Sequence, residues 1–182
     1  IFCRAKQEKK NFDKRINQKQ KGKKEEKQKK NNFSLQFINY YDDQRFGIHK
    51  NNHFIGKLLL KKQFKEAVEM LKTREDYQIS LLKKYLEKQP TDIIGALREL
   101  PKKHLLLFIH AYQSYLWNET VKEYMKQKKV WYTIAAYSCG ELFFPQKFPK
   151  NSKNISIPII GFAAECDNKD VEKCIKQVMA EE

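Results

Sequence analysis

The stretch that most constrains the fold of this chain runs from about Lys102 to Gln127. Apolar side chains recur there every three or four residues, the period of an α-helix, so the pattern predicts one long helix with a wide buried face. The residues of that face are Leu105, Phe108, Ile109, Tyr112, Leu116, Val121, Tyr124 and Met125. This is the longest helix that the sequence predicts.

Four shorter helices are predicted on either side of the long one, over residues 54–72, 75–88, 92–100 and 170–179. The first of them has Asn51 or Asn52 as a plausible N-cap. Its buried face is predicted to carry Leu60, Phe64, Ala67, Val68 and Leu71. Pro90 separates the second helix from the third, because a proline ring disfavours helical conformation in the preceding residue.

The pattern changes after the long helix. Residues 130–137, 142–144 and 155–162 are rich in β-branched and aromatic side chains and are joined by loops that carry Gly and Pro. These features predict strands, and residues 33–40 are predicted to be a further extended segment. The chain is therefore expected to have an α+β fold, helix-rich in the middle and strand-bearing toward the end.

Length and charge narrow the choice of partner. The 182 residues suffice for one domain, or for one domain with an appendage. The formal net charge of +15 indicates a polyanionic partner. Residues 1–32 carry thirteen Lys or Arg against four Asp or Glu, a net charge of +9, and we expect them to form a basic, disordered arm. Such an arm either tethers phosphate backbones or is only a solubilising tail that reflects a lysine-rich composition.

Membrane and metal-binding roles are not supported. No apolar run approaches the length of a membrane span, and the first residues lack the apolar stretch of a secretory signal, so we expect a soluble protein. Cys3, Cys139, Cys166 and Cys174 form no Cys-x-x-Cys pair, and the four histidines complete no zinc pattern. Reduced thiols and no metal site are therefore predicted.

Residues 39–47 read Asn-Tyr-Tyr-Asp-Asp-Gln-Arg-Phe-Gly, and we call them the signature loop. Aromatic faces beside amide and guanidinium donors are what a protein needs to hold an unstacked RNA base. The candidate RNA-binding residues are Asn39, Tyr41, Gln44, Arg45 and Phe46. The alternative is structural, with Gln44 and Arg45 bracing the turn and Phe46 in the core; we favour the core for Phe46 and base stacking for Tyr41.

A second group of polar residues lies on the long helix. His110, Gln113, Ser114 and Asn118 recur at spacings of three to four, so they share one side of it. The amides and the hydroxyl of this group are candidates to bridge the helix to the signature loop. The apolar residues between them, including Trp117, are expected to serve packing.

Both segments resemble motifs of the TruD family of pseudouridine synthases. The signature loop resembles the family motif Asn-Tyr-Phe-Gly-x-Gln-Arg-Phe-Gly, with Tyr41 in the place of Phe and Asp42 in the place of Gly. Residues 110–118 resemble the helix motif His-Ala-Tyr-Gln-Ser-x-Leu-Trp-Asn of archaeal and eukaryotic-like members. Further similarities, over a stretch of roughly residues 33–165, are Asn52, Gly56, Ala67 and the segment 157–162.

The resemblance implies an enzyme that isomerises uridine to pseudouridine in tRNA or other structured RNA. Such an enzyme flips the uridine out of its stack, uses an aspartate and needs no metal or organic cofactor. The resemblance also implies a catalytic-domain segment over residues 33–56, an inserted domain over 57–182, and a cytoplasmic location, or a nuclear one in a eukaryote. Asn39 and Tyr41 would lie at the cleft, with Tyr41 stacked on the flipped base.

One motif of the family is not matched. Its catalytic aspartate sits in a motif close to Gly-x-Lys-Asp-Lys/Arg-x-Ala-x-Thr-x-Gln, and Asp13 has basic neighbours but lacks the Gly, Ala and Thr. Asp42 and Asp43 are better explained as lineage variation than as a relocated nucleophile, so the catalytic residue is not assigned. We therefore expect a fragment of a synthase that is inactive alone. The alternatives are a non-catalytic RNA-binding protein of the same fold and a basic helical module with an accidental resemblance.

Overall fold

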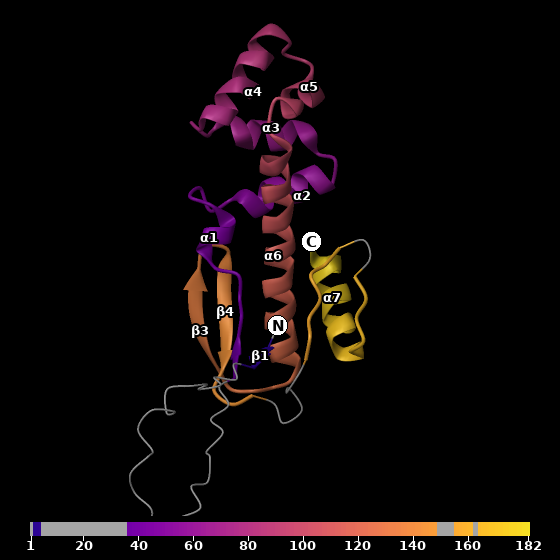
Figure 1. The fold of residues 1–182 in the computed structure, drawn as a ribbon. Helices are drawn as coiled ribbons and strands as arrows, with labels where there is room; N and C mark the ends of the chain where they lie inside the picture. Colours follow the sequence, from indigo (N-terminus) through magenta and orange to yellow (C-terminus); the bar gives the residue numbers. More distant parts are fainter. Residues whose placement is uncertain (1, 5–35, 149–154, 162–163) are drawn as a thin grey trace, which may run out of the picture.

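A computed structural model describes residues 2–4, 36–148, 155–161 and 164–182 of the chain. Figure 1 shows that the fold is built along one long helix, α6, with a bundle of short helices at one end and a β-hairpin and a second helix beside the other end. This arrangement confirms the predicted α+β class.

Helix α6 spans Lys102–Gln127, the bounds that the apolar period predicts. Its first turn follows Pro101, and the chain leaves it through Lys129, which adopts a left-handed conformation with φ of 50°. Most of its buried side chains lie in the second half, where α6 is covered on more than one side. Among the described residues, no helix combines the length and the apolar character that crossing a membrane requires.

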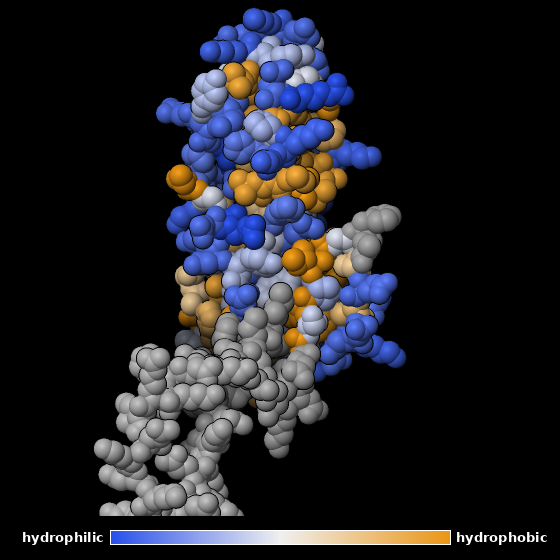
Figure 2. Space-filling view, in the orientation of Figure 1, coloured by the Kyte–Doolittle hydropathy of each residue, from blue (hydrophilic) through white to orange (hydrophobic). Residues whose placement is uncertain are grey.

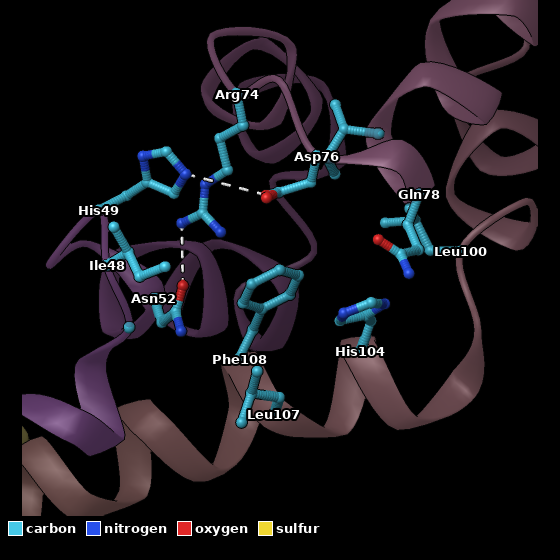
Figure 3. Close-up of a pocket in the computed structure, with 12 residues that line it drawn as sticks. Ile48, His49, Asn52, Arg74, Asp76, Gln78, Leu100, His104, Leu107 and Phe108 are labelled. Carbon is cyan, nitrogen blue, oxygen red and sulfur yellow. Dashed lines mark hydrogen bonds and ion pairs between the residues drawn. The ribbon is translucent and has the colours of Figure 1, made fainter.

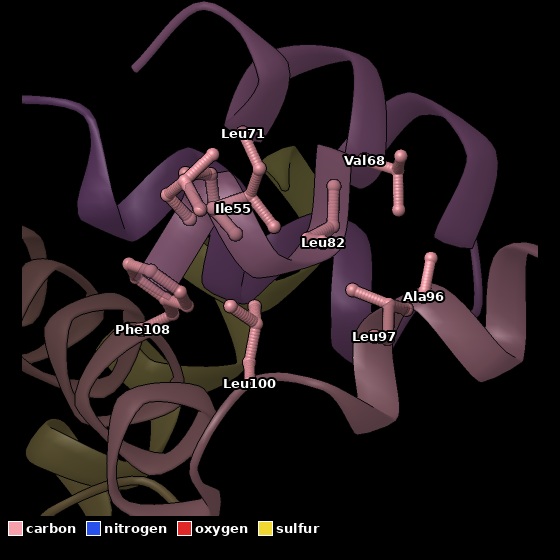
Figure 4. Close-up of a cluster of buried hydrophobic side chains, with 9 residues drawn as sticks. Ile55, Val68, Leu71, Leu82, Ala96, Leu97, Leu100 and Phe108 are labelled. Carbon is pink, nitrogen blue, oxygen red and sulfur yellow. The ribbon is translucent and has the colours of Figure 1, made fainter. Parts of the chain in front are cut away.

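Four short helices form a bundle at the N-terminal end of α6, and α2 packs against α6 itself. They are α2 (Asn52–Leu60), α3 (Phe64–Lys72), α4 (Tyr77–Lys88) and α5 (Ile93–Arg98). Figure 4 shows the apolar side chains that these helices direct toward one another and toward α6. The buried members of this cluster are Ile55, Val68, Leu71, Ile79, Leu82, Ala96, Leu97, Leu100 and Phe108.

The single helix predicted over residues 54–72 is wrong, because the structure divides it into α2 and α3. The chain turns at Lys62, whose φ of 58° is left-handed and cannot continue a right-handed helix. Leu60, which the apolar spacing places on the buried face, is 52% exposed as a result. The polar run that precedes Phe64 is the local sign of this turn.

Two strands after α6 form a hairpin, as predicted. Strand β3 (Tyr132–Tyr137) pairs antiparallel with β4 (Gly140–Pro145), and Thr133 lies opposite Phe144. Phe143 is buried toward α6, whereas most side chains of β3 are exposed. The hairpin therefore covers one side of the second half of α6, beside the chain segment that leads into the signature loop (Figure 1).

A second pair of strands lies before the signature loop. Strand β2 (Gln36–Ile38) falls in the predicted extended segment and pairs antiparallel with β1 (Phe2–Arg4). Residues 2–4 thus form a strand where the sequence predicts a disordered arm. The rest of that arm, residues 5–32, lies outside the described residues.

The strand predicted over residues 155–162 is wrong for the part that is described, since residues 155–161 form no strand. Side chains of α6 take the hydrogen bonds that a neighbouring strand would otherwise make: Trp117 Nε1 donates to the carbonyl of Ile157 at 3.0 Å, and Gln113 Nε2 donates to the carbonyl of Ile160 at 2.7 Å. Pro158 has no N–H to offer a strand. The segment is held to a helix instead of a sheet.

Helix α7 spans Lys169–Glu181 and confirms the last predicted helix. Asn168 caps it, with its side chain accepting from the N–H groups of Asp170 and Val171. Its buried stripe packs on the second half of α6, where Trp117 lies fully buried. The buried members of this second cluster are Ile38, Trp117, Val121, Tyr124, Met125, Ile157, Val171 and Cys174.

Candidate functional site

The signature loop is fixed to α6 by the side chain of Asn118. Its Oδ1 accepts from the backbone N–H of Tyr41 at 3.0 Å, and its Nδ2 donates to the carbonyl of Tyr41 at 2.8 Å. Asn118 is 1% exposed, so both bonds form away from water. The predicted bridge between the helix motif and the signature loop is therefore made by this residue.

Two tyrosine rings of the loop pack on the buried indole of Trp117. The ring of Tyr41 meets the indole edge-on at a centroid distance of 5.6 Å, and that of Tyr40 does so at 6.3 Å. The Tyr40 hydroxyl donates to the carbonyl of Phe143 in β4 at 2.9 Å. Burial raises the pKa of Tyr40 well above its usual range, so this hydroxyl stays protonated and fixes the loop to the hairpin.

The two acidic residues of the loop serve its local structure. Asp42 caps the short helix α1 (Asp43–Phe46), because its Oδ1 accepts from the N–H of Asp43 at 2.7 Å. The Asp43 carboxylate accepts from the backbone N–H of Ser138 at 2.8 Å. Hydrogen bonds from Ser138 lower the pKa of Asp43, so the carboxylate stays charged near neutral pH.

A cavity of about 450 Å³ lies at the signature loop, and we call it the loop cavity. It is lined by Tyr40, Tyr41, Asp42, Gln44, Arg45 and Leu107. The guanidinium of Arg45 lies over the ring of Tyr41, 5.3 Å from its centroid. The cavity thus brings two half-buried aromatic rings, one cation and one amide side chain together.

The structure groups three of the five predicted RNA-binding residues. Tyr41, Gln44 and Arg45 line the loop cavity. Asn39 is exposed and does not line it. Phe46 is fully buried, where its ring packs edge-on against the rings of His53 and Tyr137, so it supports the loop from below.

The loop ends at Gly47, which packs against the start of α2. Gly47 has a left-handed φ of 77°, and a Cβ there would overlap the side-chain amide of Asn52. The buried Arg74 donates through Nη2 to Oδ1 of Asn52 at 2.9 Å and also to Oδ1 of Asn51. Asn51 occupies the predicted N-cap position of α2, yet its side chain makes no cap bond.

The remaining polar residues of the predicted helix group do not bridge α6 to the signature loop. Gln113 reaches the carbonyl of Ile160, and Ser114 donates to the carbonyl of His110 in its own helix. His110 is exposed. Of this group only Asn118 contacts the signature loop through a hydrogen bond.

Cys139 and His53 also lie close together, with 3.4 Å between Sγ and Nδ1. Burial lowers the pKa of His53 to about 4 and raises the pKa of the Cys139 thiol. Both groups are therefore neutral near pH 7, which is the reverse of an activated thiolate–imidazolium pair. Among the described residues there is also no cluster of His, Cys, Asp or Glu able to hold a metal ion.

Three residues of the loop cavity are not among the predicted RNA-binding residues. Tyr40 and Asp42 line the cavity beside Tyr41. Leu107 comes from α6, where it is 40% exposed and lies off the predicted apolar face. An apolar side chain outside the buried stripe is the one signal that could have identified Leu107.

An aromatic ring, a planar cation and an amide around one cavity form a site suited to an unstacked nucleobase. Comparison with known proteins shows the family of the chain. The family model described as tRNA pseudouridine synthase D (TruD) matches residues 1–78 and 71–142. This chain belongs to the TruD family.

Several relatives have similar sequences. A probable tRNA pseudouridine synthase D of Nanoarchaeum equitans is 33% identical over 162 residues, which are 69% of this chain and 41% of that protein. A probable tRNA pseudouridine synthase D 1 of Methanococcus maripaludis is 31% identical and covers 83% of this chain and 49% of its own length. The tRNA pseudouridine synthase D of Aquifex aeolicus is 30% identical, and the match covers 79% of this chain and 45% of that protein.

The chain spans less than half the length of each of these relatives. No solved structure matches it.

Proposed function

We propose that this chain supplies the base-holding part of an RNA pseudouridine synthase. The observation that carries the proposal is the loop cavity, in which Tyr41 presents its ring while Asn118 fixes its backbone by two hydrogen bonds. A uracil flipped out of its stack lies on this ring, in the place that the Arg45 guanidinium occupies without RNA. Arg45 then pairs with a backbone phosphate, to which its planar fork is suited.

The reaction that this site serves is an isomerisation. The bond between N1 of uracil and C1′ of the ribose breaks, and a bond between C5 and C1′ forms. The C5 proton is lost to solvent and N1 gains a proton, so the composition of the RNA does not change. In this proposal the chain's own residues exclude water from one face of the base and fix its orientation.

Asp42 is not proposed as the nucleophile. It is the one carboxylate that lines the loop cavity among the residues that the structure describes, and its Oδ1 already accepts from the N–H of Asp43. Asp42 is also exposed, so its carboxylate is solvated by water and serves as the cap of a helix rather than facing a sugar. We therefore assign residues 33–56 to binding within a catalytic-domain segment and propose 57–182 as an inserted domain that supports it.

The proposed partner is transfer RNA or another structured RNA. The net charge of +15 supports a polyanionic partner. The relatives that carry this sequence pattern are named for tRNA pseudouridine synthesis. A single-stranded or flipped-out segment of such an RNA is the ligand that a stacking site favours.

The test is the release of tritium from tRNA that carries tritium at C5 of uridine, measured together with RNA binding by the full chain. Tyr41→Ala removes the stacking ring, which contributes about 1–3 kcal/mol per base, and is expected to weaken binding by roughly 5- to 150-fold. Tyr41→Phe keeps the ring and is the matched control, expected to bind like the original chain.

The two readouts separate catalysis from RNA binding. Tritium release that disappears in Tyr41→Ala establishes a synthase. Binding that depends on Tyr41 without any release supports the base-holding role of the loop cavity, and it is the result expected both of a synthase part that is inactive alone and of a non-catalytic RNA-binding protein. Equal RNA binding by Tyr41→Ala and Tyr41→Phe would refute a role for the loop cavity in either function.

A further inference from the structure

A second cavity, of about 240 Å³, lies between the end of the signature loop, the turn before α4 and the first half of α6. Figure 3 shows the side chains that converge on it from these elements. We call it the Arg74 cavity, and its lining includes Asn52, Arg74, Asp76, Leu107 and Phe108. It is smaller than the roughly 300 Å³ at which cavities for drug-sized ligands begin, a size suited to one planar heterocycle.

Arg74 leaves one donor unused in this cavity. The residue is 4% exposed, its Nη2 holds Asn51 and Asn52, and its planar group lies over the ring of Phe108 at 5.2 Å. Its Nε is buried and has no hydrogen-bond partner among the described residues. A buried donor without a partner costs stability, so it favours a ligand that presents an acceptor.

Asp76 offers an acceptor beside this donor. It occupies the N-cap position of α4, but its side chain makes none of the cap bonds that this position normally provides. Its carboxylate lines the cavity instead, where Nε2 of His49 approaches Oδ2 to 3.8 Å (Figure 3). The carboxylate therefore remains available to donors of a ligand.

The Arg74 cavity adjoins the loop cavity. The exposed side chain of Leu107 lines both of them and lies between the two sites. Figure 2 shows a hydrophobic patch among hydrophilic residues at about this level of the molecule. Two bases of one strand can thus be held on the two sides of a single apolar side chain.

The chemistry of the Arg74 cavity selects among RNA groups. A backbone phosphate is disfavoured, because the negative charge of Asp76 would face it. A neutral heterocycle fits the apolar side chain of Leu107, which is 40% exposed, and it must offer an acceptor to Arg74 and donors to Asp76. Guanine presents O6 next to N1–H and N2–H on one edge, and a carboxylate can accept both of those donors together.

Resting on the proposed function, we propose that the Arg74 cavity is a second RNA subsite that binds a guanine base near the target uridine. Arg74 Nε–H donates to O6, and the Asp76 carboxylate accepts from N1–H and N2–H. Leu107 covers the apolar surface of the base, and Phe108 supports the Arg74 guanidinium that lies over its ring. The site thereby adds a base preference to an enzyme whose loop cavity reads the target uridine.

The test is a titration of the full chain with guanosine, inosine and adenosine monophosphates, followed by the backbone amide signals of Gln78 and His104 in NMR spectra. Both residues line the Arg74 cavity and neither lines the loop cavity. Guanosine monophosphate is expected to bind best. Inosine monophosphate lacks N2–H and is expected to bind about tenfold more weakly, since it forgoes one hydrogen bond to a charged group.

The variant that isolates the carboxylate is Asp76→Asn, and its matched control is Glu75→Gln, an exposed neighbour that does not line the cavity. Asp76→Asn is expected to lose at least about tenfold in affinity for guanosine monophosphate, while Glu75→Gln keeps it. Equal binding of guanosine and adenosine monophosphates, or an unchanged preference in Asp76→Asn, overturns the proposal. A thermal melt of each variant establishes that it is folded.

Failure of this inference is distinguishable from failure of the proposed function. Tyr41 does not line the Arg74 cavity, so Tyr41→Ala is expected to leave the guanosine signals unchanged while it weakens RNA binding. Loss of the guanine preference with intact dependence on Tyr41 removes only the second subsite. A guanine preference without any dependence on Tyr41 removes only the role of the loop cavity.

Discussion

Asn118 fixes the backbone of the signature loop at Tyr41. Both hydrogen bonds of its side chain go to the backbone of Tyr41, so one buried side-chain amide determines the position and orientation of that backbone. Replacing it by Leu keeps the volume but leaves the buried N–H and carbonyl groups of Tyr41 without partners. The position of the base-holding ring therefore depends on a residue 77 positions away in sequence.

For Asn118→Leu we expect a loss of about 2–3 kcal/mol in the free energy of unfolding, measured by urea titration, together with weaker RNA binding. The control is Gln113→Leu, which removes a hydrogen bond from α6 to the carbonyl of Ile160 but touches no residue of the loop. It is expected to lower stability without a comparable effect on RNA binding. Equal effects of both variants on RNA binding would contradict the role given to Asn118.

His53 makes the stability of the protein depend on pH. It is 3% exposed, and burial lowers its pKa from an ordinary value of 6.5 to about 4. The unfolded chain therefore binds a proton between pH 6.5 and 4 that the folded chain does not. The contribution of the neutral, buried His53 to the free energy of unfolding is fully present above pH 6.5 and is lost as the pH falls toward 4. The free energy of unfolding changes with pH by at most about 1.4 kcal/mol per pH unit from this residue.

The variant that tests this dependence is His53→Phe, which keeps an aromatic ring between Phe46 and Tyr115 but cannot be protonated. Urea unfolding at pH 7, 5.5 and 4.5 is expected to show a smaller loss of stability for this variant than for the original chain. If the free energy of unfolding falls equally with pH in the two proteins between pH 7 and 4.5, His53 is not buried in its neutral form.

At the scale of the residue, the sequence predicts chemical types better than positions. Tyr41, Gln44 and Arg45 were identified because an aromatic, an amide and a cation stand together in one motif. Arg74 stands alone in a turn, and its value comes from being buried against Phe108 and two asparagines. The one signal in the sequence is that this chain has five arginines beside many lysines. An arginine in such a chain indicates a position where the planar guanidinium group is needed.

At the scale of the element, α2 and α6 pack closely at Gly56. A Cβ at this position would overlap the backbone carbonyl of Phe108, and a backbone group in the middle of a helix cannot move aside. The Arg74 cavity and the first core cluster both use Phe108, so this contact lies between them. Glycine is required here for helix packing and not for a turn.

Gly56→Ala is accordingly expected to destabilise the protein by about 1–3 kcal/mol, measured by thermal or urea unfolding. The matched control is Gly161→Ala, where the nearest side-chain atom is an ordinary 3.5 Å from the added Cβ and the residue is exposed. That change is expected to alter stability by less than about 0.5 kcal/mol. Similar losses in both variants would indicate that the α2–α6 contact is looser than the structure shows.

Helices and strands were predictable from the sequence where the local spacing of apolar residues determines them. The bounds of α6 follow from a long apolar period, and the helix predicted over residues 170–179 is α7. The split between α2 and α3 depends on a left-handed Lys62, which has no strong signature in the side-chain pattern. The segment 155–161 has the composition of a strand, but distant side chains of α6 bind its carbonyl groups.

At the scale of the whole molecule, charge determines how binding responds to salt. With a net charge of +15, the affinity of the full chain for RNA is expected to fall steeply as salt rises, with a slope of about −0.7 in log–log form for each phosphate neutralised on a single strand. Fluorescence anisotropy with a labelled RNA at several salt concentrations measures this slope.

Tyr41→Ala provides the control for this slope, because it removes stacking without changing the charge. Its binding curve is expected to be displaced to weaker affinity with the same slope. A binding constant that is insensitive to salt would exclude an electrostatic role for the basic residues, whichever part of the chain carries them.

The assembled sites show what a single sequence does not reveal. Each cavity combines residues of the signature loop with Leu107 of α6, and the Arg74 cavity adds the turn before α4. Motif spacing predicted that a loop and a helix would meet, and Asn118 confirms this. Which side chains lie around an empty space depends on helix packing angles, and these are properties of the assembled molecule.

The length of α6 between Leu107 and Asn118 has a consequence for how such a protein can change over time. Eleven residues make about three helical turns, so the two side chains point to the same side of the helix about 16 Å apart. Insertion of a single residue between them would rotate one relative to the other by about 100° and separate the anchor of Tyr41 from the wall of both cavities. Insertions and deletions should therefore be tolerated in the surface loops and rejected in this interval of α6.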